Sequence, residues 1–140
     1  MTRRQEAAIK LLVAADLVRK RMAAAVEPYG VTLQQYNVLR ILRGAGEPLP
    51  TLEIGDRMIE QTPGVTRLID RLEQKDLVAR RRSSEDRRVY YCSITAEGLS
   101  LLASMDAVVD AADDASVDPL DPDQTDSLIT LLDTLLRGSR

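Results

Sequence analysis

The sequence predicts a mainly α-helical protein that carries one small β-hairpin. Apolar residues recur at the three- and four-residue spacing of amphipathic helices along most of the chain. One basic, polar stretch is flanked by two short segments of strand character, which predicts the hairpin. Apolar residues fill 44% of the 140 positions and include neither Phe nor Trp, so the core must be aliphatic. Such a core suits packed helices better than a β-sandwich.

Two helices are predicted in the first third of the chain. The first covers residues 4–27 and ends before Pro28, because a proline that is soon followed by glycine interrupts the helical pattern. The second follows Thr32, which is spaced to form a capping box with Gln35, and it ends at Gly44.

Two shorter helices come next and indicate a helix-turn-helix. The first begins at Pro50 and runs to about Met58. The second has Thr62 as its N-cap and Pro63 in its first turn, and it runs to about Lys75. Opposite its apolar face, this helix presents the polar side chains of Thr66, Arg67, Asp70 and Arg71.

A two-stranded hairpin follows the helix-turn-helix, in the place of a wing. Its strands are predicted at residues 77–79 and 89–94, on either side of a polar tip. The basic residues of this segment are Arg80, Arg81, Arg82, Arg87 and Arg88. Taken alone, such arginines are more often solvated surface, but their position on a hairpin after a helix-turn-helix favours contact with nucleic acid.

Two further helices complete the chain. One opens near Thr95 and runs to about Ala115, and the last contains the apolar positions between residues 128 and 136. Two Asp-Pro pairs separate them. The predicted order is therefore α-α-α-α-β-β-α-α. The apolar first and last helices carry more Leu and Val than one small lobe can bury, which predicts a second copy as partner.

The charge distribution favours a DNA-facing middle and an acidic C-terminal part. The net charge is −3, but residues 1–50 carry +4, residues 51–95 carry +1 and residues 96–140 carry −8. Acidic groups are repelled by phosphate, whereas the arginines of the hairpin are attracted to it. The low overall charge is therefore compatible with binding nucleic acid.

The residue types present argue against an enzyme and against a metal site. Cys92 is the single cysteine and the chain has no histidine, so neither a disulfide within the chain nor an imidazole-based metal or nucleophile site can form. No glycine-rich phosphate loop is present. We expect no cofactor, and the absence of a long apolar segment predicts a cytoplasmic protein without a membrane span.

Several motifs, in order and at matching spacing, make the sequence similar to a known family. They are Thr32–Leu39 (TLQQYNVL), Val65–Glu73 (VTRLIDRLE), Asp86-Arg87-Arg88 and Ile94–Gly98 (ITAEG). Over nearly its whole length the chain resembles the MarR family of bacterial transcription regulators. The resemblance implies a winged helix-turn-helix protein that binds double-stranded DNA at a near-palindromic operator as a homodimer. It also implies a repressor that is released by a small aromatic or phenolic effector.

The resemblance divides the chain and assigns roles to residues. It implies dimerisation segments at residues 1–30 and 96–140 around a DNA-binding domain at 31–95. The implied DNA contacts are Thr66 and Arg67 to base edges, Thr62, Gly64 and Arg71 to phosphates, and Arg87 in the minor groove; Arg80 and Arg82 join them as basic residues of the wing. Asp70 and Arg88 match a pair that ties the recognition helix to the wing.

Two departures from the family pattern affect this mapping. Asp76 follows Lys75 where the family usually has glycine, so a left-handed turn residue must be formed by Asp at some cost. The segment Ile59-Glu60-Gln61 replaces the commoner small residues between the two short helices, which leaves the angle between those helices open.

Several of these residues also have purely structural interpretations. Asp70 with Arg71 would also fit an ordinary exposed helix pair, and Thr66 would also fit a hydrogen bond to its own backbone. Cys92 is expected to be a buried or half-buried thiol, with redox sensing as the alternative. Tyr29 and Tyr36 either line an effector pocket or fill the core.

At the level of the whole protein, the alternative to a DNA-binding regulator is a winged-helix module that binds another protein. A module of that kind has no need for a row of arginines along one edge.

Overall fold

The computed structural model describes residues 1–59 and 64–139. The elements are α1 (Arg3–Val26), the 3₁₀ turn η1 (Glu27–Tyr29), α2 (Leu33–Ala45), β1 (Leu49–Pro50), α3 (Thr51–Arg57), α4 (Val65–Gln74), β2 (Val78–Arg82), β3 (Tyr90–Ile94), α5 (Ala96–Val117) and α6 (Pro122–Arg137). The predicted six helices and the hairpin are confirmed in their predicted order. The structure adds the short strand β1 and the turn η1.

The chain folds into two compact units, and their boundaries fall inside helices. One unit is residues 23–109, and the other combines residues 1–22 with residues 110–140. The predicted division into dimerisation and DNA-binding segments at residues 30 and 95 stays a prediction. The end of α1 and the first half of α5 belong to the larger unit. Their buried side chains there are Val26, Leu102, Met105 and Val109.

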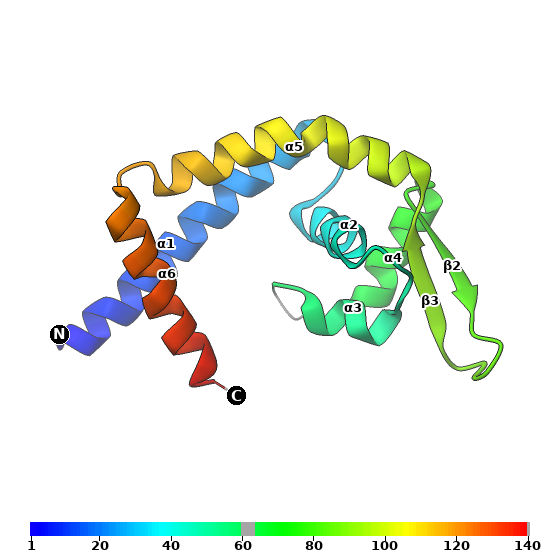
Figure 1. Ribbon diagram of the computed structural model, residues 1–140, viewed down its shortest axis with the longest axis horizontal. Coiled ribbons are helices and arrows are strands. Elements are labelled where there is room, and N and C mark those ends of the chain that lie inside the picture. The colour runs from blue at the N-terminus through cyan, green and yellow to red at the C-terminus, as the bar shows by residue number, and fades with distance from the viewer. Residues whose placement is uncertain (60–63, 140) are drawn as a thin grey trace. The chain divides into compact units, whose positions relative to one another are not determined.

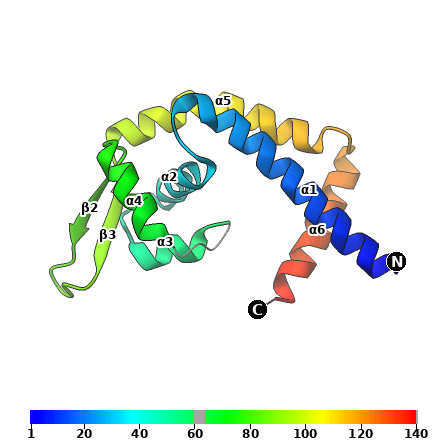
Figure 2. The same cartoon turned by 180° about the vertical axis from the view of Figure 1, so that it is seen from behind.

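The larger unit is built around α2, with the sheet and α4 packed on it (Figures 1 and 2). The Thr32 hydroxyl accepts from the backbone N–H of Gln35, and the Gln35 side chain accepts from the N–H of Thr32, so the predicted capping box is confirmed. The fully buried aliphatic core contains Val38, Leu39, Leu42, Ile54, Ile69, Leu72 and Val78. Helices therefore supply most of the core, as the composition predicts.

The sheet has three strands rather than the predicted two, in the order β1-β3-β2. β1 pairs with β3 through Leu49 opposite Cys92 and Pro50 opposite Tyr91. A two-residue strand that contains proline has no alternating pattern from which to recognise it, and proline is tolerated at a sheet edge because it cannot donate to the ladder. The sequence pattern therefore could not predict this strand.

The hairpin strand β2 extends beyond its predicted end and includes three arginines. It pairs antiparallel with β3, with Arg80 opposite Cys92, Arg81 opposite Tyr91 and Arg82 opposite Tyr90. Since successive residues of a strand point to opposite faces, Arg80 and Arg82 share the face of the buried Val78, whereas Arg81 points to the other face. The wing arginines thus have two different environments.

Helix α4 begins two residues later than the proline pattern predicts, with Gly64 as its N-cap residue. The predicted cap at Thr62 and the first-turn position of Pro63 lie outside the described residues, as do two of the three residues of the segment 59–61. The predicted division of the helix into an apolar and a polar face is confirmed: Ile69 and Leu72 are buried.

Helix α4 ends in a left-handed turn at Asp76, whose φ is +62°. The N–H of Asp76 donates to the Glu73 carbonyl at 2.9 Å, and the N–H of Leu77 donates to the Leu72 carbonyl at 3.0 Å. These two bonds form a Schellman motif, in which glycine is the usual left-handed residue. The expectation of a left-handed Asp at this position is confirmed.

Replacing Asp76 with glycine is expected to stabilise the protein. Glycine adopts a positive φ without the steric cost that a Cβ imposes, so we expect a gain of roughly 0.5–1 kcal/mol in the free energy of unfolding. Urea denaturation at fixed protein concentration measures it. Asp76→Ala keeps the Cβ and removes the carboxylate, so this control should not be stabilised. Equal gains in both variants would show that the Cβ at this position does not strain the left-handed turn.

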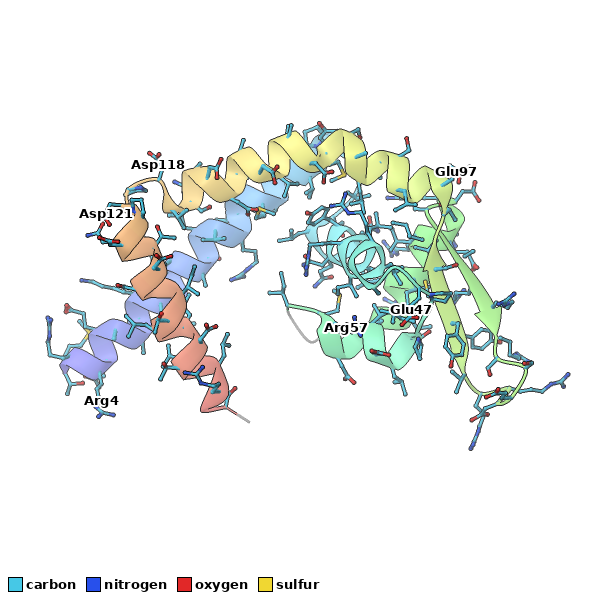
Figure 3. All side chains as sticks on the ribbon, in the orientation of Figure 1. Arg4, Glu47, Arg57, Glu97, Asp118 and Asp121 are labelled. Atoms are coloured by element: carbon cyan, nitrogen blue, oxygen red, sulfur yellow. The ribbon has the colours of Figure 1, made fainter. Side chains whose placement is uncertain are left out.

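The smaller unit consists of the first part of α1, the end of α5 and α6. The guanidinium of Arg21 donates to the carbonyl of Ala115 at 2.8 Å and thereby joins α1 to the last turn of α5. Asp121 accepts from the N–H of Gln124 in a capping box, with Pro122 in the first turn, so this Asp-Pro pair starts α6 at the turn that Asp118 and Asp121 mark in Figure 3. Within the described ranges, no helix has the length and apolar character needed to cross a membrane.

Candidate nucleic-acid interface

The outward face of α4 presents cationic and polar groups to solvent. Thr66, Arg67 and Arg71 are exposed, and within residues 1–59 and 64–139 their side chains make no hydrogen bond or ion pair. A shallow hollow of about 550 Å³ lies along this face and is lined by Gln35, Arg67, Asp70, Arg71, Gln74 and Lys75. Arginines whose donors are uncommitted are available to a ligand with acceptor groups. The structure therefore leaves Thr66, Arg67 and Arg71 exposed on one helix, and their contacts with DNA stay predictions.

Arg80 lies between two carboxylates of α4. Its Nη2 is 2.6 Å from Oδ1 of Asp70 and 2.9 Å from Oε1 of Glu73, and its backbone N–H donates to Oε2 of Glu73 at 3.2 Å. The hydrogen bond from Arg80 lowers the pKa of the Glu73 carboxyl, and the same bond raises the pKa of the guanidinium. Arg80 therefore ties the wing strand β2 to the helix.

The expected tie between Asp70 and Arg88 is not formed. Arg88 bonds Asp86 instead: its backbone N–H lies 3.0 Å and its Nε 3.2 Å from Oδ1 of Asp86, and its side chain is 91% exposed. Arg88 belongs to the tip of the hairpin, whereas Arg80 stands on the face of β2 that packs against α4. The strand register therefore selects Arg80 as the partner of Asp70, and Arg80 is committed within the protein instead of being free for DNA.

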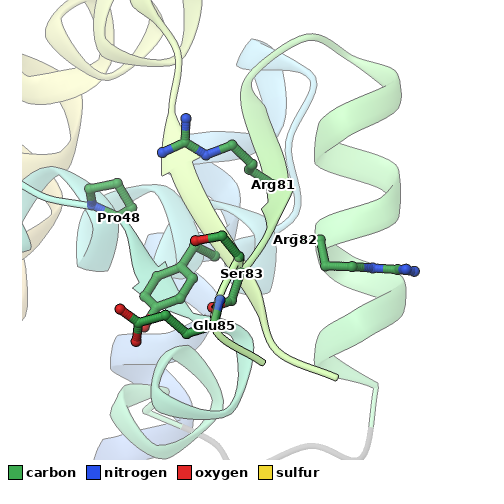
Figure 4. A pocket seen from close by; sticks show the side chains of 7 residues that line it. Pro48, Arg81, Arg82, Ser83 and Glu85 are labelled. Atoms are coloured by element: carbon green, nitrogen blue, oxygen red, sulfur yellow. Dashed lines mark hydrogen bonds between the residues drawn. The ribbon is translucent and has the colours of Figure 1, made fainter. Parts of the chain in front are cut away.

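Arg82 is held at the edge of the wing by Tyr90. Its Nε donates to the phenol oxygen of Tyr90 at 3.0 Å, and its guanidinium carbon lies 5.1 Å from the centre of the Tyr90 ring. Figure 4 shows Arg81 and Arg82 leaving β2 in opposite directions. Arg81 lines a hollow of about 560 Å³ with Pro48, Arg82, Ser83, Ser84, Glu85 and Tyr91. The wing thus offers cationic groups on both faces.

The tip of the hairpin presents Arg87. The Oγ of Ser83 accepts from the backbone N–H groups of Glu85 and Asp86, which closes the turn. Arg87 is exposed and makes no hydrogen bond or ion pair with any described residue. Its predicted contact with the minor groove stays a prediction.

Two expected phosphate contacts precede α4. Thr62 lies outside the described residues. Gly64 is half-buried, and a Cβ built at this position would meet nothing within 4 Å among the described atoms. The phosphate role of Gly64 accordingly stays a prediction.

The expected effector pocket is not apparent at the two tyrosines. Tyr36 is 4% exposed in the core and takes part in interactions there, whereas Tyr29 is half-buried. The hollows described above are lined by other residues. The pocket therefore stays a prediction.

Cys92 is a buried thiol. It is fully inaccessible, and burial raises its pKa to about 11, so the thiol is protonated at neutral pH. These properties favour the structural interpretation of Cys92 over redox sensing. Among the described residues, no group of three or more Cys, Asp or Glu is arranged to hold a metal ion.

Known proteins are similar to this chain in both sequence and fold. The profile of the MarR family matches residues 31–90. A MarR transcription factor of Planctomyces limnophilus, known from its crystal structure, is 34% identical; the match covers 96% of this chain and 98% of that one, with a TM-score of 0.74. The chain belongs to the MarR family.

Two curated members of the MarR family come from Bacillus subtilis (strain 168). The HTH-type transcriptional repressor MdtR is 42% identical over 81 residues, which are 58% of this chain and 52% of MdtR. The HTH-type transcriptional regulator MhqR is 33% identical over 85 residues, which are 61% of this chain and 58% of MhqR. The matched part of the chain thus spans between half and three fifths of these relatives.

Three residues of this interface were missed by sequence reasoning. Glu73 shares Arg80 with Asp70, Tyr90 holds Arg82, and Lys75 is hydrogen-bonded at the end of α4. Only the alternation of side chains along β2 could have indicated Glu73, because Arg80 follows the buried Val78 by two residues. The other two contacts depend on how distant segments meet.

Proposed function

We propose that this protein is a DNA-binding transcriptional regulator that acts as a repressor and reads a near-palindromic operator as a homodimer. The observation that carries the proposal is the polar face of α4, where Arg67 and Arg71 are exposed and uncommitted beside the arginines of the wing. A helix of this kind fits the major groove, where an arginine fork donates twice to guanine. A non-enzymatic role in the cytoplasm follows from this function.

The different positions of the cationic groups support the proposal. Arg67 lies on the first turn of α4 after Gly64, where recognition helices meet base edges, and Arg71 follows one turn later for a phosphate contact. Arg82 and Arg87 extend from the wing toward the flanking backbone or minor groove. Arg80 neutralises Asp70 and Glu73, so that no unpaired carboxylate of this pair faces the phosphates.

The kind of regulation is proposed from relatives. MdtR, which is 42% identical over 81 residues, is named a transcriptional repressor. We extend repression to this protein, with a small aromatic or phenolic effector that releases the DNA. Tyr29 and Tyr36 remain the candidates for effector contact.

The decisive experiment is selection of bound duplexes from a random DNA pool by the full chain. Enrichment of an inverted repeat is expected, because two identical lobes read two half-sites. A matched selection with Arg67→Ala, Arg71→Ala should lose that enrichment. No enriched sequence with the natural chain would contradict the proposal and would favour a protein-binding module.

The homodimer predicts a specific assembly state. α6 has no buried residue, and Ile129, Leu131 and Leu135 are 52%, 64% and 58% exposed, while Leu12 and Val13 of α1 are 70% and 63% exposed. So much exposed aliphatic surface on two helices requires a partner. Sedimentation should show a dimer at micromolar concentration, and Leu131→Glu, Leu135→Glu should shift it to monomer. A natural chain that sediments as a monomer would refute the assembly.

Arg67→Ala is expected to reduce discrimination between the selected duplex and random DNA. A bidentate contact to a base is worth roughly 1–3 kcal/mol, so affinity for the selected duplex should fall by about tenfold or more while affinity for random DNA changes little. Fluorescence anisotropy with both duplexes measures the ratio. Equal losses on both would assign Arg67 to a phosphate.

A further inference from the structure

Lys75 stands at the end of the cationic stripe of α4. It follows Arg67 and Arg71 by eight and four residues, so the three side chains fall along one side of the helix. The two arginines are uncommitted within the described residues, but the lysine is engaged. Its Nζ donates to the carbonyl oxygen of Gly30 at 2.6 Å and to Oε1 of Gln35 at 3.2 Å.

One acceptor lies in the first turn of α2 and the other just before that helix. Gly30 adopts a left-handed conformation with φ +78° between the 3₁₀ turn and the helix. Gln35 is 4% exposed, and its Oε1 also accepts from the N–H of Thr32 at 3.1 Å, which is one half of the capping box. Lys75, the C-cap residue of α4, therefore joins the end of that helix to the cap of α2, across 45 residues of chain.

Because Lys75 lies at the end of α4, its contact with the start of α2 affects how the arginines of that helix are oriented. Its own backbone N–H donates to the carbonyls of Arg71 and Leu72 at 3.3 and 3.2 Å, so the anchor acts on the last closed turn of α4. On the β2 side, Arg80 holds Asp70 and Glu73 of the same helix. A helix held from two sides has its rotation about its own axis restricted, and that rotation decides where the arginine side chains point.

We propose that Lys75 is a positioning residue for DNA binding: it locks the end of α4 to the capping box of α2 and so orients Arg67 and Arg71, without touching DNA itself. The inference rests on the proposed function. Its rival is a direct contact of the Lys75 ammonium with phosphate. The two roles differ in their dependence on salt, because a phosphate contact releases a counterion and a positioning contact does not.

The test uses the full chain and the duplex that it selects from the random pool. Lys75→Met should weaken binding by roughly five- to tenfold, the size expected for a residue that orients DNA-contacting groups without touching DNA, with the salt slope of log affinity unchanged. Arg87→Met is the matched control, because it removes one cation from the wing tip and should lower the slope by about one. A slope that also falls by about one in Lys75→Met would overturn the proposal, and so would unchanged affinity.

A double-variant cycle tests the contact with Gln35. Gln35→Glu keeps both the cap and the acceptor, since glutamate suits this capping-box position. In that background Lys75→Met leaves a buried carboxylate unpaired, so the combined loss of affinity should exceed the product of the two single effects. Effects that multiply without excess would show that the two side chains do not act together and would overturn the proposal.

Hydrogen exchange of the free protein separates this inference from the proposed function. Lys75→Met should accelerate exchange of the Gln35 and Tyr36 amides, which bond the Thr32 hydroxyl and carbonyl, whereas Arg87→Met should leave them unchanged. If the natural chain selects no duplex, the proposed function fails, yet this measurement still decides the anchor. Unchanged exchange in Lys75→Met would refute it.

Discussion

Gly98→Ala should destabilise the protein by about 2–3 kcal/mol, the cost of forcing an extra methyl group into a packed site. A Cβ at this position would lie 2.4 Å from the carbonyl oxygen of Leu77 and 2.6 Å from Cγ1 of Ile94. Real Cβ atoms do not approach a backbone oxygen this closely, and the Leu77 carbonyl is held because it accepts from the N–H of Thr95 at 3.1 Å. The start of α5 must therefore move away from the sheet.

Gly44→Ala is the matched control for this change. Gly44 also lies in a helix, but a Cβ there meets nothing within 4 Å among the described atoms. Alanine should stabilise this site by roughly 0.5–1 kcal/mol through its higher helix propensity. Urea denaturation at one protein concentration compares the two, because the proposed dimerisation would make stability concentration-dependent. A Gly98→Ala variant as stable as the natural chain would contradict the close approach of α5 to the turn before β2.

Arg80→Met should reduce affinity for the selected duplex on the order of 100-fold, because two hydrogen bonds from a charged donor to partly exposed carboxylates are worth about 3 kcal/mol together, the low end of their range. The change frees the wing strand from α4. It also leaves Asp70 and Glu73 as unpaired carboxylates on the helix that we propose faces the phosphates. The lost contact between the wing and α4 and the added repulsion between these carboxylates and the phosphates both lower the affinity for DNA. Fluorescence anisotropy measures the affinity, and a loss below about threefold, the size of an exposed pair, would contradict the role of Arg80 as the tie.

Double-variant cycles distinguish Arg80 from the residue that the sequence suggested. Asp70→Asn combined with Arg80→Met should cost less than the two single changes together, because each single change leaves one charge unpaired. Asp70→Asn combined with Arg88→Met should be additive, since Arg88 bonds Asp86. Coupling between Asp70 and Arg88 would show that the register of the wing differs from the one described.

The same tie predicts a dependence of stability on pH. The pKa of Glu73 is lowered from its usual value of 4.5 by the hydrogen bond from Arg80. A carboxyl with a lowered pKa stabilises the fold above its unfolded-state pKa, and this contribution is lost as the pH falls through the folded-state value. The stability difference between the natural chain and Arg80→Met should therefore shrink below pH 4.5.

Local structure was accessible from the sequence because it depends on neighbours. The capping box at Thr32, the left-handed Asp76 and the helical stripe of α4 are each determined within a few residues, and the structure confirms them. The two-residue strand β1 was missed because its pairing with β3 joins positions that lie 41 or more residues apart. Helices, caps and turns follow from local spacing, whereas strand pairing depends on the fold.

The candidate site divides in the same way. The cationic character of α4 and of the wing follows from composition and spacing, so Arg67, Arg71 and Arg87 were identified without the structure. The partners of the charged groups within the protein could not be identified in this way. Asp70 pairs with Arg80 and not with Arg88, and Lys75 is hydrogen-bonded to the cap of α2. Both contacts join segments whose relative position no local pattern specifies.

By itself, the sequence determined the helices, the hairpin, the family resemblance and the set of cationic residues, because periodicity, capping and charge are properties of short stretches. Tertiary structure alone decided which arginine is committed to Asp70, where Lys75 is anchored and why Gly98 tolerates no Cβ. These depend on strand register and on the approach of α5 to the turn before β2. A one-residue change of register would move each wing arginine to the other face of the hairpin, so its role is set by packing and not by its neighbours in the chain.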